Sequence, residues 1–86
     1  MQHSTLTVKN YSGLHARPAS QLIELANTFA SSIIIKHAEV VADAKSIISL
    51  LSAGIKQGTV IELEVEGADE KEAIAAITEL INGLEG

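Results

Sequence analysis

The sequence predicts an α+β fold, an open-faced β-sandwich with element order βαββαβα and three helices on one face of a four-stranded, mainly antiparallel sheet. Apolar and polar residues alternate over 4–9 and 59–66, as in strands with one covered face. Apolar residues instead recur every three or four positions over 18–29 and 69–84, as in amphipathic helices. The 86 residues are 47% hydrophobic, which suffices for one core, so we expect a single domain over 1–86.

The first strand and helix are separated by a loop at residues 10–13. In the strand, Leu6 and Val8 share one face. Pro18 suits the first turn of the helix, because an N–H group there has no intrahelical partner to lose. The residues from Leu14 to Arg17 should therefore lie at a helix N-terminus.

Two short strands and a short helix follow. The β-branched run 33–35 predicts the second strand, and Val40-Val41 predicts the third. The turn at 37–39 lacks the Asn-Gly or Asp-Gly signature of a tight hairpin, so its geometry stays open. A short helix is expected over 46–53, with Ser46 as its N-cap.

The clearest strand lies at 59–66, and the last helix follows it. Ile61, Leu63 and Val65 face one way, whereas Glu62, Glu64 and Glu66 face the other. Three carboxylates on one face require water, which favours an antiparallel sheet covered on one side only. The last helix should begin near Asp69-Glu70, because acidic side chains suit the positive end of the helix dipole.

Composition excludes several classes of function. There is no cysteine, and the six Lys and Arg residues are scattered against eleven acids, so neither a disulfide nor nucleic-acid binding is expected. Neither a signal peptide nor a run of about 20 apolar residues occurs, which predicts a cytoplasmic protein without membrane insertion. His3 and His37 belong to no motif, and a metal site would require them to converge with His15, so no metal is expected.

The segment from Gly13 to Ser20 carries the chemistry. A helix N-terminus favours an anion, because its first N–H groups are free and its dipole is positive there. A neutral His15 is nucleophilic, and Arg17 presents a fork of donors to phosphate oxygens. Together they predict a transient phosphohistidine. The residues alone leave a plainer interpretation open, in which His15 only caps the helix and Arg17 is solvated.

The same segment resembles the signature of a known family. Gly13-Leu14-His15-Ala16-Arg17-Pro18-Ala19 is similar to the active site of HPr, the phosphocarrier family of the bacterial phosphoenolpyruvate-dependent sugar phosphotransferase system. Residues 44–47, 57–59 and 66–70 are also similar to family segments at the same places. The resemblance covers essentially the whole chain, with the family's usual length and element order.

The resemblance implies a carrier and not an enzyme. Enzyme I, charged by phosphoenolpyruvate, would phosphorylate His15 at Nδ1, and the phosphoryl group would pass to a IIA domain of a sugar permease. Arg17 would steady the phosphate, and the backbone N–H groups of Ala16 and Arg17 would cradle it. The resemblance implies no cofactor, and a monomer fits a carrier that presents one face to successive partners.

Ser46 has two compatible interpretations. It can serve as a helix N-cap, which contributes about 1 kcal/mol. The family resemblance also implies phosphorylation of Ser46 by an HPr kinase/phosphorylase, and through it binding to a catabolite-control transcription regulator. A phosphate at a helix N-terminus complements the dipole, so its effect should fall on partners and not on folding.

A surface for partners is expected on the first two helices. Ile47, Ile48, Leu50 and Leu51 are too many apolar residues for a short helix to bury, so we expect Leu50 in the core and the others exposed near His15. Structural packing alone is the competing explanation. The expected docking residues are Ser20, Glu24, Ile47, Ile48, Leu51 and Ser52.

Glu24 departs from the family pattern, because many members have a basic or apolar residue there. With the net charge of −5, it leaves fewer cations to steer an acidic partner.

Three other functions compete with the phosphocarrier interpretation. A regulatory-only relative would lack the histidine that His15 provides. The nitrogen-related branch has the same chemistry but generally departs from the Ala44-Lys45-Ser46 segment. A small-molecule-binding domain would need a ligand pocket and would take up no phosphoryl group.

Overall fold

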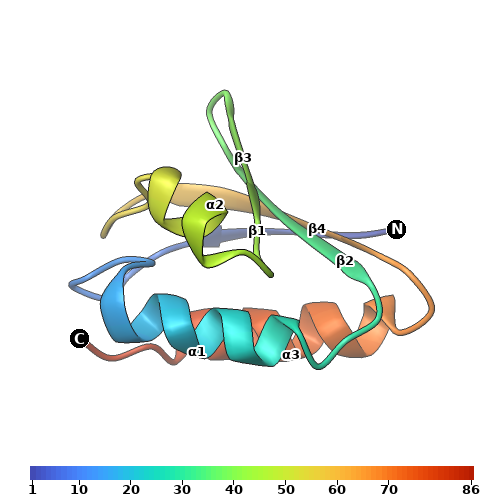
Figure 1. The fold of residues 1–86 in the computed structure, drawn as a ribbon. Coiled ribbons are helices and arrows are strands. Elements are labelled where there is room, and N and C mark those ends of the chain that lie inside the picture. The colour runs from blue at the N-terminus through green and yellow to red at the C-terminus, as the bar shows by residue number, and fades with distance from the viewer.

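The computed structural model describes residues 1–86 and has the predicted element order (Figure 1). The elements are β1 (Gln2–Thr7), α1 (Ala16–Ala26), β2 (Ser32–His37), β3 (Val40–Asp43), α2 (Ile47–Ser52), β4 (Val60–Glu66) and α3 (Glu70–Asn82). No helix is both long enough and apolar enough to cross a membrane.

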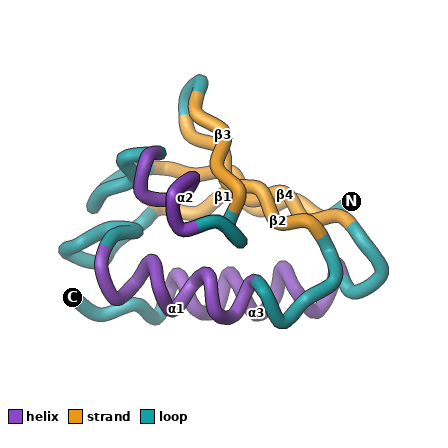
Figure 2. The backbone as a smooth tube through the Cα atoms, in the orientation of Figure 1, coloured by secondary structure: helices purple, strands orange, loops and turns teal.

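The four strands form one sheet in the order β1-β4-β2-β3, and every neighbouring pair is antiparallel. Helices α1 and α3 lie side by side across one face of this sheet, and α2 packs against α1 and β3 (Figure 2). The opposite face carries no helix. This arrangement confirms the predicted α+β open-faced sandwich.

The core lies between the sheet and the helices, as the strand pattern predicts. In β4, Ile61, Leu63 and Val65 are buried, and their neighbours point to the uncovered face. There Glu64 is less exposed than the alternation implies, because Lys36 Nζ lies 2.8 Å from its Oε2 atom. The hydrogen bond and charge of Lys36 hold the pKa of Glu64 below its usual range.

Several element boundaries differ from the predicted ones by one to three residues, most clearly those of β1 and α1. Strand β1 ends at Thr7, and Val8 is buried beyond it, where its N–H group donates to the Thr59 carbonyl. Helix α1 begins at Ala16, two residues before Pro18, and ends at Ala26. Phe29 packs against the core from the turn after the helix, so its apolar character extended the predicted helix too far.

The β2–β3 connection is a tight turn although it has no glycine. His37 pairs with Val40, which leaves only Ala38 and Glu39 in the turn. Ala38 adopts a φ of 53°, a left-handed conformation that costs about 1–2 kcal/mol for a residue with a Cβ atom. The pairing of the two strands therefore determines this turn, and its own residue types do not.

The Asp69 carboxylate joins the start of α3 to the end of the α1–β2 connection. It accepts hydrogen bonds from the N–H groups of Ala30 (2.8 Å) and Ser31 (2.9 Å) and from Ser31 Oγ (2.5 Å). The bonds from Ser31 Oγ and the Ala30 backbone hold the pKa of Asp69 below its ordinary value of 3.8. Since the ionised form is favoured in the fold, this contribution to stability is present above pH 3.8 and is lost as the pH falls through the lowered pKa.

We expect Asp69→Asn to lower the urea midpoint at pH 7, because an amide cannot accept all three hydrogen bonds. The difference from the wild-type midpoint should shrink as the pH falls below about 4. Glu64 and Glu70 also have lowered pKa values, so the variant keeps part of its acid sensitivity. A difference in midpoint that is constant from pH 7 to pH 2.5 would contradict this account.

Candidate functional site

The loop between β1 and α1 has a fixed backbone. The buried Asn10 side chain donates to the Gly13 carbonyl at 2.7 Å, and the Gly13 N–H group donates to the Asn10 carbonyl at 3.1 Å. Gly13 has a φ of +62° and packs closely on the backbone of Ile55 and Lys56. Leu14 is buried, and its N–H group donates to the Ile55 carbonyl. These contacts fix the point at which the chain enters α1.

His15 occupies the N-cap position of α1, as predicted, but it does not cap the helix. Its backbone is extended, and its side chain accepts no hydrogen bond from the first turn. Instead, ring atom Nδ1 lies 3.3 Å from the Ser12 carbonyl oxygen. The half-exposed ring can donate this hydrogen bond when Nδ1 carries the proton. The plainer interpretation of His15 as a helix cap is therefore wrong.

The first turn of α1 leaves two backbone donors free. The first helical N–H groups belong to Ala16 and Arg17, since Pro18 has none, and neither donates to another group of the protein. Ala16 has a φ of 52°, a strained conformation for alanine that costs about 1–2 kcal/mol. Strain of this kind often marks a functional site.

Arg17 is the only basic residue on α1. Its side chain is exposed and forms no ion pair with a carboxylate of the protein. The structure thus brings together a histidine ring, two free N–H groups and a free guanidinium at one helix end. This combination can bind an anion and place a nucleophilic nitrogen beside it.

Ser46 is the N-cap of α2, as predicted. Its Oγ atom accepts a hydrogen bond from the Ser49 N–H group at 3.3 Å. The half-exposed hydroxyl therefore already stabilises the helix. The side chain of Asn27, at the end of α1, donates to the Lys45 carbonyl and links the two helices beside Ser46.

The exposed apolar patch on α2 is confirmed. Leu50 is fully buried, whereas Ile48 is 76% exposed and Ile47 and Leu51 are each 42% exposed. Ser20, Glu24 and Ser52 are also exposed. In Figure 1, α2 lies at the same end of the protein as the loop before α1 and the start of α1. Docking of a partner on these residues stays a prediction.

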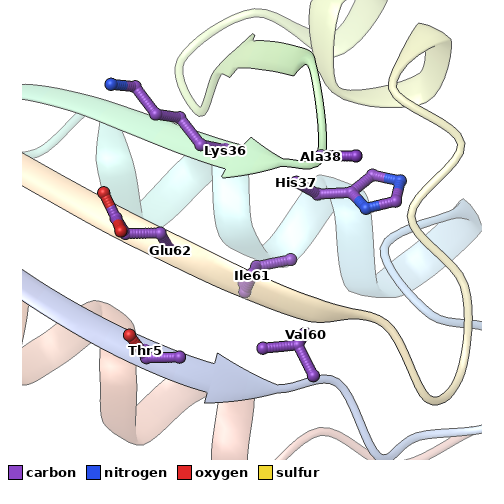
Figure 3. A pocket seen from close by; sticks show the side chains of 7 residues that line it. All are labelled: Thr5, Lys36, His37, Ala38, Val60, Ile61 and Glu62. Atoms are coloured by element: carbon purple, nitrogen blue, oxygen red, sulfur yellow. The ribbon is translucent and has the colours of Figure 1, made fainter.

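The other two histidines lie on the sheet and not beside the start of α1. His3 is on β1 with its Nδ1 atom 4.0 Å from Glu62, on the uncovered face of the sheet, and His37 ends β2. A hollow of about 310 Å³ on that face is lined by Thr5, Lys36, His37, Ala38, Val60, Ile61 and Glu62 (Figure 3). None of these residues is a predicted site residue, and none belongs to α1 or to the loop before it.

The sequence patterns do not predict one exposed residue near His15. Tyr11 lies in the loop before α1 and is 83% exposed. Its aromatic character suggests burial, and no local pattern in the sequence indicates that the side chain is exposed.

The chain is similar to known phosphocarrier proteins. A family model described as "PTS HPr component phosphorylation site" matches residues 2–83. The chain is 45% identical over 80 residues to the phosphocarrier protein NPr of Proteus mirabilis, covering 92% of this chain and 89% of NPr. It is 40% identical over 86 residues to the phosphocarrier protein HPr of Neisseria meningitidis, covering 100% of this chain and 97% of that protein.

Solved structures agree with the sequence comparison. The crystal structure of HPr-C-His from Thermoanaerobacter tengcongensis is 43% identical and superposes with a TM-score of 0.93. The match covers 95% of this chain and 92% of that one.

Proposed function

The chain belongs to the HPr family of phosphocarrier proteins of the phosphoenolpyruvate-dependent sugar phosphotransferase system, and on this basis we propose that His15 carries the phosphoryl group. A protein of this family is a carrier and not a catalytic enzyme, and its partners are enzyme I and IIA domains. The observation that carries the assignment to His15 is the free anion-binding end of α1 beside the imidazole. We further propose that the carrier acts as a cytoplasmic monomer.

The proposed transfer is a displacement at phosphorus. A bond forms between His15 Nδ1 and the phosphorus atom while the bond between phosphorus and the donor side chain of enzyme I breaks. The donor side chain keeps the electron pair of the broken bond. Nδ1 must first present its lone pair, so its contact with the Ser12 carbonyl breaks and the ring proton resides on Nε2. The second transfer repeats the displacement, with a IIA domain as acceptor.

The phosphoryl oxygens gain donors at the same end of the helix. The N–H groups of Ala16 and Arg17 point out of the first turn, and the guanidinium of Arg17 can donate two parallel hydrogen bonds. These donors favour the phosphorylated state, and the water-exposed position leaves the group accessible to the next protein. The phosphohistidine is thereby stable enough to form and still able to pass its phosphoryl group to the next protein.

Incubation with phosphoenolpyruvate, Mg²⁺ and enzyme I tests this proposal. We expect the intact mass to increase by one phosphoryl group and to return to its starting value in mild acid, as a phosphohistidine does. Failure to gain mass with several enzyme I preparations, or an acid-stable product, would contradict the proposal.

We also propose regulatory phosphorylation of Ser46. Its support is the half-exposed hydroxyl at the start of α2, next to the apolar patch. A phosphate there would meet the positive end of the helix and add negative charge to the partner surface. The proposed agents are an HPr kinase/phosphorylase and a catabolite-control transcription regulator. An acid-stable phosphate that forms with kinase and ATP, and is absent in Ser46→Ala, is the expected result; no phosphorylation would refute it.

A second candidate function comes from the NPr relative. Its 45% identity favours a nitrogen-related phosphocarrier with the same His15 chemistry and a different enzyme I. The Ala44-Lys45-Ser46 segment favours the sugar branch. Initial rates of phosphorylation by enzyme I of each type distinguish the two, since the cognate donor should be the faster one.

A further inference from the structure

Tyr11 is more exposed than any other large hydrophobic side chain of this protein. The only other aromatic residue, Phe29, packs against the core. An aromatic ring in water forgoes the stabilisation that burial provides. Tyr11 therefore contributes little to folding, and contact with a binding partner is the better explanation for an aromatic ring at this position.

The backbone around Tyr11 is held in place on both sides. Asn10 is buried and shares two hydrogen bonds with Gly13. The Ser12 N–H group donates to the Gly86 carbonyl oxygen at 2.7 Å. A side chain displayed from an ordered backbone loses less conformational entropy on binding than one on a mobile loop. Tyrosine adds a large contact area with only two side-chain torsions to fix, which makes it a frequent interface anchor.

Tyr11 lies close to the phosphoryl site. It directly precedes Ser12, whose carbonyl oxygen is 3.3 Å from His15 Nδ1. Consecutive Cα atoms are about 3.8 Å apart, so the Tyr11 Cα atom lies within about 10 Å of His15 Nδ1. That separation is within the footprint of an ordinary protein interface centred on His15. The apolar patch of α2, formed by Ile47, Ile48 and Leu51, lies at the same end of the protein (Figure 1).

We propose that the Tyr11 ring is a docking anchor for enzyme I, the protein that donates the phosphoryl group. This inference rests on the proposed phosphoryl transfer to His15. The aromatic face makes the contact, so the matching surface of enzyme I is apolar or carries a cation that stacks on the ring. Tyr11 acts on the affinity of the encounter and not on the chemical step.

Steady-state kinetics with enzyme I and phosphoenolpyruvate test the inference, with this protein as the varied substrate. Tyr11→Ala should raise KM about tenfold and leave kcat unchanged, because it removes a contact made equally before and during transfer. Tyr11→Phe should keep KM within about twofold, since it retains the ring. Val41→Ala is the matched control: Val41 is 61% exposed but lies on β3, away from His15, and its removal should not change KM.

An unchanged KM in Tyr11→Ala overturns the docking role while phosphoryl uptake itself persists. A fall in kcat at constant KM also overturns it, because Tyr11 would then act on the chemistry. If the wild-type protein takes up no phosphoryl group, the proposed function fails, and this inference fails with it.

Discussion

Replacing His15 with alanine is expected to reduce phosphoryl uptake from enzyme I more than about 1,000-fold, because the other two histidines lie on β1 and β2 and not at the free end of α1. The folding free energy should change by no more than about 1 kcal/mol, since the His15 side chain gives α1 no capping hydrogen bond and its one hydrogen-bond contact is with the Ser12 carbonyl. Intact mass over time measures uptake, and urea unfolding of the same sample measures stability.

His37→Ala is the matched control for this substitution. His37 is half-exposed, as His15 is, but it ends β2 and has no free helix N-terminus beside it. We expect wild-type uptake in this variant. Equal losses in the two variants would mean that His15 has no special role.

Replacing Gly13 with alanine is expected to destabilise the fold by at least about 2 kcal/mol. The residue has a left-handed φ of +62°, and an added Cβ atom would lie 2.5 Å from both the Ile55 carbonyl oxygen and the Lys56 Cα atom. Both contacts are with backbone, which cannot rotate away as a side chain can. The loop that precedes His15 must shift, so phosphoryl uptake should slow as well.

Gly54→Ala separates the two causes of that effect. Gly54 has nearly the same φ, +66°, but an added Cβ atom would meet nothing within 4 Å. Its cost should therefore be only that of the left-handed backbone, about 1 kcal/mol. Urea midpoints of both variants measure the difference. Equal destabilisation would show that the close packing of Gly13 on Ile55 and Lys56 contributes nothing.

Local patterns predict the elements and much of the site. The alternation of Ile61, Leu63 and Val65 with glutamates defines the covered face of β4 without knowledge of its neighbours. The position of Pro18 places His15 at a helix N-terminus, and Ser46 is the N-cap that its residue type predicts. In each case the information lies within one turn or one strand.

Local sequence patterns do not predict contacts between residues that are far apart in the chain. The left-handed backbone of Ala38 follows from the pairing of β2 with β3, and the hydrogen bonds that Ser31 donates to Asp69 span 38 positions. The left-handed Ala16 and the contact between His15 and the Ser12 carbonyl depend on how the loop packs against Ile55. These features are set by the assembled fold, and they include much of the site's detailed geometry.

The central claim, that His15 carries a phosphoryl group in transit, is tested most directly by ³¹P NMR of the protein after phosphorylation by enzyme I and removal of the donor. The account predicts one phosphohistidine resonance, absent in His15→Ala, that disappears when a IIA domain is added and reappears on that domain. A resonance that survives addition of the cognate IIA domain, or one that persists in His15→Ala, would contradict it.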